Sequence, residues 1–174
     1  MLDDLENIKH KQIQTTKDIF ELSRLSKVYC YHQVPGKNIK AIMDQANWSY
    51  GELLSDLVYN TTTKNWNRQM VAGVLFIAFP FNHHPIEKHL AVRIFACEPW
   101  YELDNTVKWI KYRVTKLLED RTDFVGFSWM VDEHNEPLIK CLSENEFHAK
   151  GLKKVPSSNN KGNKEYISKI QFIL

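Results

Sequence analysis

The feature that most constrains the fold is the run Met70–Phe79, which contains no charged or polar side chain. The run is rich in β-branched and aromatic residues, as is typical of a strand that is covered on both faces. The chain has 174 residues, of which 43% are hydrophobic, and this supplies apolar material for one well-filled core. We therefore expect a single domain over residues 1–174.

Downstream of this run, strand patterns alternate with helical ones. Turn residues at 80–85 separate the run from a second apolar stretch, Leu90–Ala96, and this arrangement predicts a β-hairpin. The next segment is helical, with Asp104 or Asn105 as its N-cap and apolar residues on one face. Phe124–Val131 then has the composition of a strand. Because such crossovers are right-handed and parallel, we expect this strand to pair in parallel with Leu90–Ala96.

The C-terminal part predicts a short helix and a final strand. The helix follows Asn135, and the strand covers residues 165–174 with every second residue from Tyr166 on one face. The pattern does not decide whether residues 150–155 form one more strand. Residues 156–164 contain no large apolar side chain, as is typical of a mobile loop.

The N-terminal part predicts a short strand over residues 8–13, followed by two or three helices. Thr15 and Thr16 can cap the first helix, whose apolar residues recur at every third or fourth position: Ile19, Phe20, Leu22, Leu25 and Val28. The second helix follows Pro35, and a third short helix is expected over residues 49–59. Without this optional helix, the predicted order is β-α-α-β-β-α-β-α-β.

One C-terminal segment resembles a known family. Asn135 stands twelve residues before Phe147, so that Asn leads into a helix and Phe returns apolar bulk to the sheet after about three turns. This segment and the element order resemble the GCN5-related N-acetyltransferase (GNAT) superfamily, in which the corresponding helix commonly begins with Asn and is followed by Gly-Phe. The resemblance implies an α/β fold with a mixed sheet flanked by helices, and acetyl transfer from acetyl-CoA to a primary amine.

The family's cofactor signature is absent from this sequence. Members carry Gln or Arg and two spaced glycines after the fourth strand, where backbone N–H groups hold the pyrophosphate of acetyl-CoA. Counted from Pro99, these positions are occupied by Glu102, Asn105 and Val107. Leu142 stands where many members have a tyrosine general acid, and Glu146 stands where they have the glycine.

The resemblance implies two sets of site residues. Glu98 or Glu102 would deprotonate the attacking amine, and Tyr101 would donate a proton. The cofactor would be held by the fourth strand, by the start of the next helix and by the N-cap of the later one: Ile94, Phe95, Ala96, Asp104, Asn105, Thr106, Val107 and Asn135. The alternative is an ordinary capped loop between strand and helix, with Trp100 and Tyr101 packed across it.

Other residue patterns favour structural roles. A cluster of imidazoles near the hairpin turn lacks a Cys or acidic ligand at matching spacing, so we expect no metal at His83, His84 and His89. The cysteines form no CxxC pair and are expected to be reduced thiols: Cys30, Cys97 and Cys141. Trp109 shares its helix with basic residues, but core packing is favoured over base stacking.

Charge and hydropathy exclude several partners. The 23 Lys and Arg against 21 Asp and Glu give a net charge of +2, which argues against a nucleic acid or an anionic membrane as a partner. There is no apolar run of the roughly 18 to 20 residues that a spanning helix needs and no signal-peptide pattern, so we expect a soluble, cytoplasmic protein.

Two functions remain open. One is a divergent N-acetyltransferase that uses acetyl-CoA and acts on an unidentified amine. The other is a non-catalytic GNAT-fold binding or structural protein with protein partners in a larger assembly. Small internal virion proteins of short-tailed phages resemble the Asn135–Phe147 segment and also lack the glycines, so the second function includes a component of a phage virion.

Overall fold

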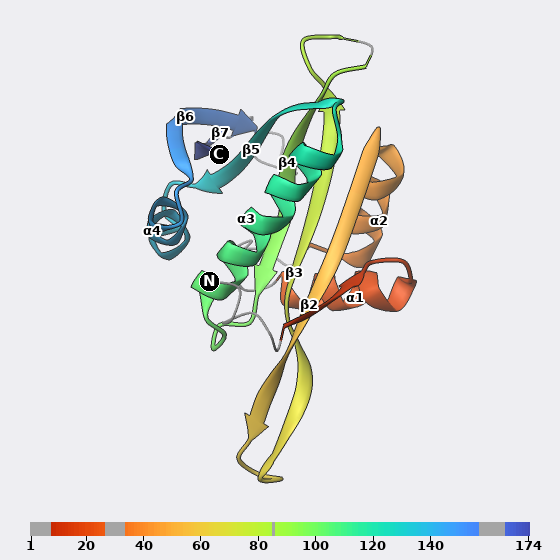
Figure 1. The fold of residues 1–174 in the computed structure, drawn as a ribbon, viewed down its shortest axis with the longest axis vertical. Helices are drawn as coiled ribbons and strands as arrows, with labels where there is room; N and C mark the ends of the chain where they lie inside the picture. The colour runs from red at the N-terminus through yellow and green to blue at the C-terminus, as the bar shows by residue number, and fades with distance from the viewer. Residues whose placement is uncertain (1–7, 27–33, 85, 157–165) are drawn as a thin grey trace.

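The computed structural model describes residues 8–26, 34–84, 86–156 and 166–174. A seven-stranded sheet has the order β1-β2-β3-β4-β5-β7-β6. Helices α1 and α2 cover one face of the sheet, and α3 and α4 cover the other (Figure 1). The strands are β1 (Lys9–Gln12), β2 (Trp48–Asn60), β3 (Asn65–Pro80), β4 (Lys88–Cys97), β5 (Phe124–Asp132), β6 (His148–Pro156) and β7 (Tyr166–Ile173). The helices are α1 (Thr16–Leu25), α2 (Gly36–Gln45), α3 (Leu103–Asp120) and α4 (Glu136–Glu144).

Strand pairing confirms the predicted hairpin and crossover. The apolar run lies in β3, which pairs antiparallel with β4, and β4 pairs in parallel with β5. Strand β7 is antiparallel to both β5 and β6, so the sheet is mixed. The strand left open near residues 150–155 exists as β6, at one edge of the sheet.

The predicted helix over residues 49–59 is wrong, because this segment is strand β2, which lies between β1 and β3. The sheet is covered on both faces here, so neighbouring residues are both buried. Leu53 packs with α1 and α2, and Leu54 packs into the core beneath α3. Apolar residues at consecutive positions of a doubly covered strand imitate the spacing of a helical face.

Side-chain caps mark the start of α1 and α4. Thr15 caps α1 as predicted and forms a reciprocal capping box with Asp18. Asn135 caps α4 as predicted, with its side-chain oxygen accepting from the N–H of Leu138 at 3.4 Å. The N-cap prediction for α3 is wrong, because the N-cap residue is Glu102, which makes no side-chain capping bond.

The core lies on both faces of the sheet. Of the predicted apolar face of α1, Leu22 and Leu25 are buried, but Phe20 is 63% exposed because it lies on the outer side of the helix. Val28 and Cys30 lie outside the described residues, as does most of the loop predicted at 156–164. None of the described helices is long and apolar enough to cross a membrane.

Candidate functional site

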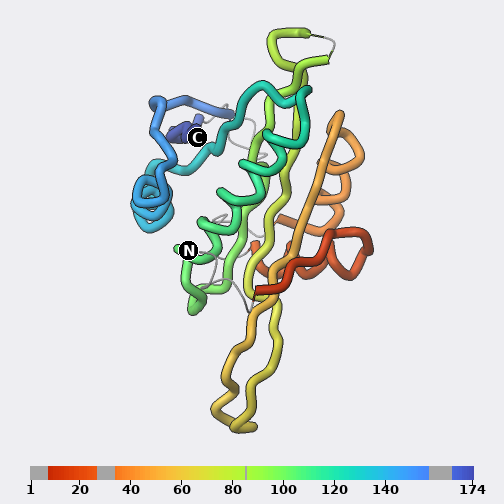
Figure 2. Tube along the Cα trace, in the orientation of Figure 1, coloured from red at the N-terminus to blue at the C-terminus, as the bar shows by residue number. Residues whose placement is uncertain are grey.

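The end of β4 parts from its neighbour β5. The two strands pair only from Lys88 to Val92, and β5 then continues beside β7 (Figures 1 and 2). At this point the register between β3 and β4 shifts, because Val92 and Ile94 face consecutive β3 residues and Arg93 is the extra residue of a β-bulge. Bulges bend a strand and interrupt pairing. The last part of β4 therefore has backbone groups on its β5 side that β5 does not pair.

The predicted cofactor residues of β4 point to opposite faces. Ile94 and Ala96 are buried against α1 and α2, whereas Phe95 is buried on the α3 side. The ring of Phe95 meets Trp129 of β5 edge to face, with 5.2 Å between centroids. The rings of Phe95 and Trp129 thus lie together on the α3 side where the two strands diverge.

The start of α3 lies directly after this strand end. The first four N–H groups of a helix have no intrahelical acceptor, and here no side chain of the N-cap residue accepts from them. Asn105 donates to the Glu102 carboxylate at 3.0 Å, while Thr106 and Val107 are buried. Free N–H groups and the helix dipole favour an anion, although Glu102 and Asp104 place negative charge beside them.

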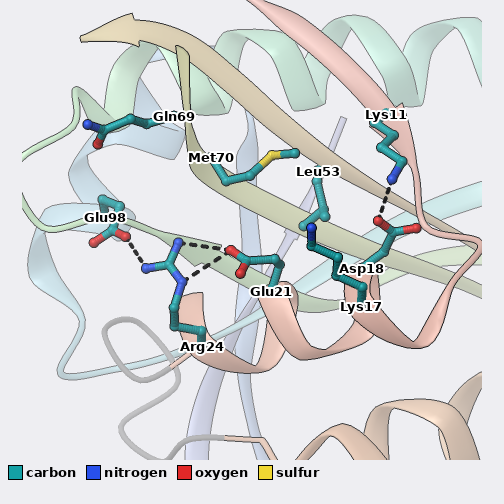
Figure 3. A pocket seen from close by; sticks show the side chains of 9 residues that line it. All are labelled: Lys11, Lys17, Asp18, Glu21, Arg24, Leu53, Gln69, Met70 and Glu98. Carbon is teal, nitrogen blue, oxygen red and sulfur yellow. Dashed lines mark hydrogen bonds and ion pairs between the residues drawn. The ribbon is translucent and has the colours of Figure 1, made fainter. Parts of the chain in front are cut away.

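Glu98 lies on the α1 side of the sheet. It lines a pocket of about 570 Å³ under α1, and its carboxylate pairs with the guanidinium of Arg24, which also pairs with Glu21 (Figure 3). The Glu98 side chain is 18% exposed. The Arg24 pairing orients Glu98 toward α1 and away from the start of α3.

Tyr101 is fixed by a hydrogen bond to β2. Its hydroxyl donates to the Asp56 carboxylate at 2.8 Å, and its backbone N–H donates to the Glu98 carbonyl. Burial and the acceptor carboxylate of Asp56 raise the pKa of Tyr101 well above its usual range. The phenol therefore keeps its proton at neutral pH and gives its hydrogen bond to Asp56.

A polar contact joins the start of α3 to the end of α4. Asn145 donates from its side-chain amide to Asp104 at 2.8 Å, and Asp104 also pairs with Lys108. These bonds hold the pKa of Asp104 below its ordinary value. Asn135 lies at the opposite end of α4, so the structure does not bring it to the start of α3 with the other predicted residues.

The described cysteines and histidines have no reactive arrangement. Burial raises the pKa of the Cys97 and Cys141 thiols to about 11, which leaves both protonated at neutral pH. The Nδ1 atom of His84 accepts backbone bonds within its own turn, and His89 packs on β5. No group of three or more potential metal ligands occurs among the described residues.

Sequence reasoning missed the partners that fix these side chains. Arg24 precedes Glu98 by 74 residues and Asp56 precedes Tyr101 by 45, so no local pattern joins them. The bulge at Arg93 was also missed, because its sequence reads as a regular strand. These contacts depend on the order of strands in the sheet, which becomes known only with the fold.

Comparisons with known proteins support this architecture. No protein-family model and no curated protein sequence matches the chain. The structure is similar to that of NAA60 from Arabidopsis thaliana in complex with acetyl-CoA, with a TM-score of 0.71 at 11% identity over 96% of this chain and 97% of the other. The chain has the GNAT fold. Other structures with the GNAT fold are also similar to this chain, with lower TM-scores.

Two bacterial structures illustrate this range. The ribosomal-protein-S18-alanine N-acetyltransferase of Escherichia coli has a TM-score of 0.62 at 13% identity, covering 96% of this chain and 92% of the other. Spermidine N-acetyltransferase from Vibrio cholerae, in complex with CoA and spermine, has a TM-score of 0.60 at 12% identity, covering 97% and 95%. At such low identity, these similarities establish the GNAT fold alone. The chemistry has to be argued from the residues of the site.

Proposed function

We propose that the protein is a divergent N-acyltransferase that takes an acyl group from acetyl-CoA and transfers it to a primary amine. The observation that carries the proposal is the position of two sets of backbone groups: the freed edge of β4 beyond Val92 and the uncapped start of α3, which follow one another in the chain. Both sets bind through the backbone and do not need the missing glycines.

The residues fit a cofactor that is held mainly by backbone groups. The N–H groups of the first turn of α3, at Leu103, Asp104 and Asn105, would bind its phosphates, and the β4 backbone at residues 94–96 would bind its extended arm. When bound, acetyl-CoA supplies the acyl thioester. Glu102 and the carboxylate of Asp104 weaken this site by repulsion, so we expect modest affinity.

Glu98 is the carboxylate that we assign to deprotonation of the amine. It lies on the α1 side of β4, opposite α3, so that an amine approaching from the N-terminal helices meets it before reaching the strand edge. The ion pair with Arg24 keeps the carboxylate oriented. Because the Tyr101 hydroxyl donates its hydrogen bond to Asp56, we assign Tyr101 to positioning the loop.

The second candidate is a non-catalytic binding module. It is favoured by one specific observation, that the polar side chains around the β4 end are paired within the protein: Glu98 with Arg24, Tyr101 with Asp56 and Asp104 with Asn145. Leu142, at the position of the family's general acid, is fully buried and has no proton to donate. A place in a larger assembly such as a phage virion stays a prediction.

Calorimetric titration with CoA separates the two functions, and Glu102→Gln sharpens the test. Gln keeps the acceptor for Asn105 and removes the charge, so CoA affinity is expected to rise by about two- to fivefold. Leu103→Pro removes one N–H at a helix position that tolerates proline and is expected to weaken binding. Absence of binding by the native protein and by Glu102→Gln at millimolar CoA would overturn the acyltransferase proposal.

Transfer is measured as release of CoA thiol from acetyl-CoA in the presence of amines. Glu98→Gln is expected to lower kcat by about 10²-fold or more, as loss of a general base does. Glu21→Gln is the matched control, since Glu21 pairs with the same Arg24 but has no assigned role in the reaction. Equal loss in both variants would mean that Glu98 acts only through Arg24.

A further inference from the structure

A groove of about 690 Å³ lies on the half of the α1 and α2 face that these helices leave uncovered. Its floor comes from β4, β5 and β7 and its walls come from β3 and β6. Helices α1 and α2 cover this face only where β2, β3 and β4 carry Leu53, Leu75 and Ile94. The groove is large enough for a small organic ligand.

The titratable side chains that line the groove are all basic. Its titratable lining residues are His89, Arg93, Lys150, Lys153 and Lys169, and no Asp or Glu occurs among its described lining residues. Asp132 faces Lys169 across the β5–β7 register but does not line the groove. In a chain with 23 basic and 21 acidic residues, this separation of charge is not expected from composition.

Several cations of the groove lack a carboxylate partner. Among the described residues, no ion pair involves Arg93, Lys150 or Lys153. The bulge that frees the end of β4 places Arg93 on this face. Burial lowers the pKa of His89, and the positive charges of Lys150 and Lys153 lower it further. The charges of these two lysines therefore reach into the groove.

A buried polar group adds an independent sign of a ligand. Gln171 of β7 is only 9% exposed and lines the groove, and its Oε1 atom has no hydrogen-bond partner among the described residues. Buried polar atoms are rarely left without a partner, because burial removes their hydrogen bonds to water. Phe79 and Phe81 flank His89 at the rim and offer apolar ring surface.

We propose that this groove binds an anionic small molecule, whose phosphate or carboxylate groups are recognised by Arg93, Lys150 and Lys153, and whose N–H or O–H donates a hydrogen bond to Oε1 of Gln171. The binding site stands independently of catalysis.

The test is calorimetric titration at low ionic strength, without acetyl-CoA. The probes are O-phospho-L-serine, the dipeptide L-glutamyl-L-glutamate, and spermidine as a cationic counterpart of similar size. We expect at least one anionic probe to bind, with an affinity that falls as salt is added, and spermidine not to bind. Tighter binding of phosphoserine assigns phosphate recognition, and tighter binding of the dipeptide assigns carboxylate recognition.

Variants link the binding to the groove. Lys150→Gln with Lys153→Gln is expected to weaken binding of the anionic probe by about tenfold or more. Lys154→Gln removes the same charge from the neighbouring β6 residue, which does not line the groove, and is expected to change affinity by less than about twofold. Failure of both anionic probes to bind at millimolar concentration, or unchanged affinity in the double variant, overturns the proposal.

Thiol release in the presence of acetyl-CoA distinguishes the two proposals. A probe that binds but releases no CoA thiol supports a groove that acts apart from acyl transfer. Acetyl transfer to spermidine without binding of either anionic probe supports the proposed function and overturns the anionic groove.

Discussion

Glu146 has a backbone conformation that glycine adopts more readily. Its φ is +63°, in the left-handed region, where it ends α4 with two bonds: its own N–H to Ser143 and the N–H of Phe147 to Leu142. This pairing is a Schellman motif, in which the left-handed residue is usually glycine. The GNAT resemblance also has glycine at this position, so the fold keeps a turn that the sequence does not favour.

Replacing Glu146 with glycine is expected to stabilise the protein. Relief of the left-handed strain should raise the melting temperature by about 2–4 °C in a chain of this size. Glu146→Ala is the control, because it also removes the ion pair with Lys111 but keeps the strain. A melting temperature for Glu146→Gly that is no higher than that of Glu146→Ala would contradict this interpretation of α4.

His89 reports on the charge around it. Burial and the charges of Lys150 and Lys153 hold its pKa below the ordinary value of 6.5. Replacing both lysines with glutamine removes the repulsion between charges, so the pKa of His89 should rise while burial keeps it below 6.5. An NMR titration of the imidazole resonances measures this shift, and an unchanged pKa would place the lysine charges too far away to act.

At the scale of elements, a buried ion pair joins β2 to α3. Glu52 is fully buried and pairs with Arg113 at 2.9 Å, and Glu52 also accepts from the hydroxyl of Tyr50. Arg113 donates to the same hydroxyl oxygen at 3.3 Å. The network fixes α3 over β2.

Arg113→Met is expected to lower the free energy of unfolding by about 3–5 kcal/mol, because it leaves the Glu52 carboxylate buried without a counter-charge. Adding Glu52→Leu should recover most of this loss, since the unpaired charge is then gone. Denaturant unfolding measures both variants. Lys116→Met, on an exposed part of α3, is the control and should unfold like the native protein. A loss below about 1 kcal/mol in Arg113→Met would mean that water reaches the carboxylate.

An element could be predicted where the residues that determine it lie close together in the sequence. The cap of α1 by Thr15 and the start of α4 at Asn135 were predictable, because the residues that decide them are close together in the chain. Strand β2 was not, because burial on both faces gave it the spacing of a helix. The pairing of Glu98 with Arg24 depends on two distant segments, so the sequence carried no signal for it.

At the scale of the whole molecule, acid stability depends on carboxylates on opposite faces of the sheet. Burial alone would raise the pKa of Asp18, but hydrogen bonds from Lys11, Gln14 and Thr15 outweigh it, so that the pKa lies well below its ordinary value. Hydrogen bonds from Arg121 and Lys88 do the same for Asp123. Both groups remain ionised in the folded protein at pH values where the unfolded chain takes up protons.

Stability should therefore be fully present at neutral pH and fall as pH drops from about 5 through 3.8 toward the lowered folded pKa values. Asp18→Asn and Asp123→Asn should each reduce the loss of melting temperature between neutral and acidic pH, although both lower it at neutral pH. Asp44→Asn, which removes a carboxylate from an exposed helical pair, is the control and should keep the native slope. Parallel melting curves for all four proteins across this range would show that other groups govern acid unfolding.

The long strand β3 has a consequence for how the molecule tumbles in solution. It runs from the β2–β3 hairpin at one end of the long axis toward the β3–β4 hairpin at the other, and α3 lies alongside it (Figures 1 and 2). An elongated body rotates more slowly end over end than about its long axis. N–H bonds lie along a helix but across a strand. The amides of α3 should therefore show higher ¹⁵N R2/R1 ratios than those of β3 and β4, and relaxation measurements on a labelled sample would detect this difference.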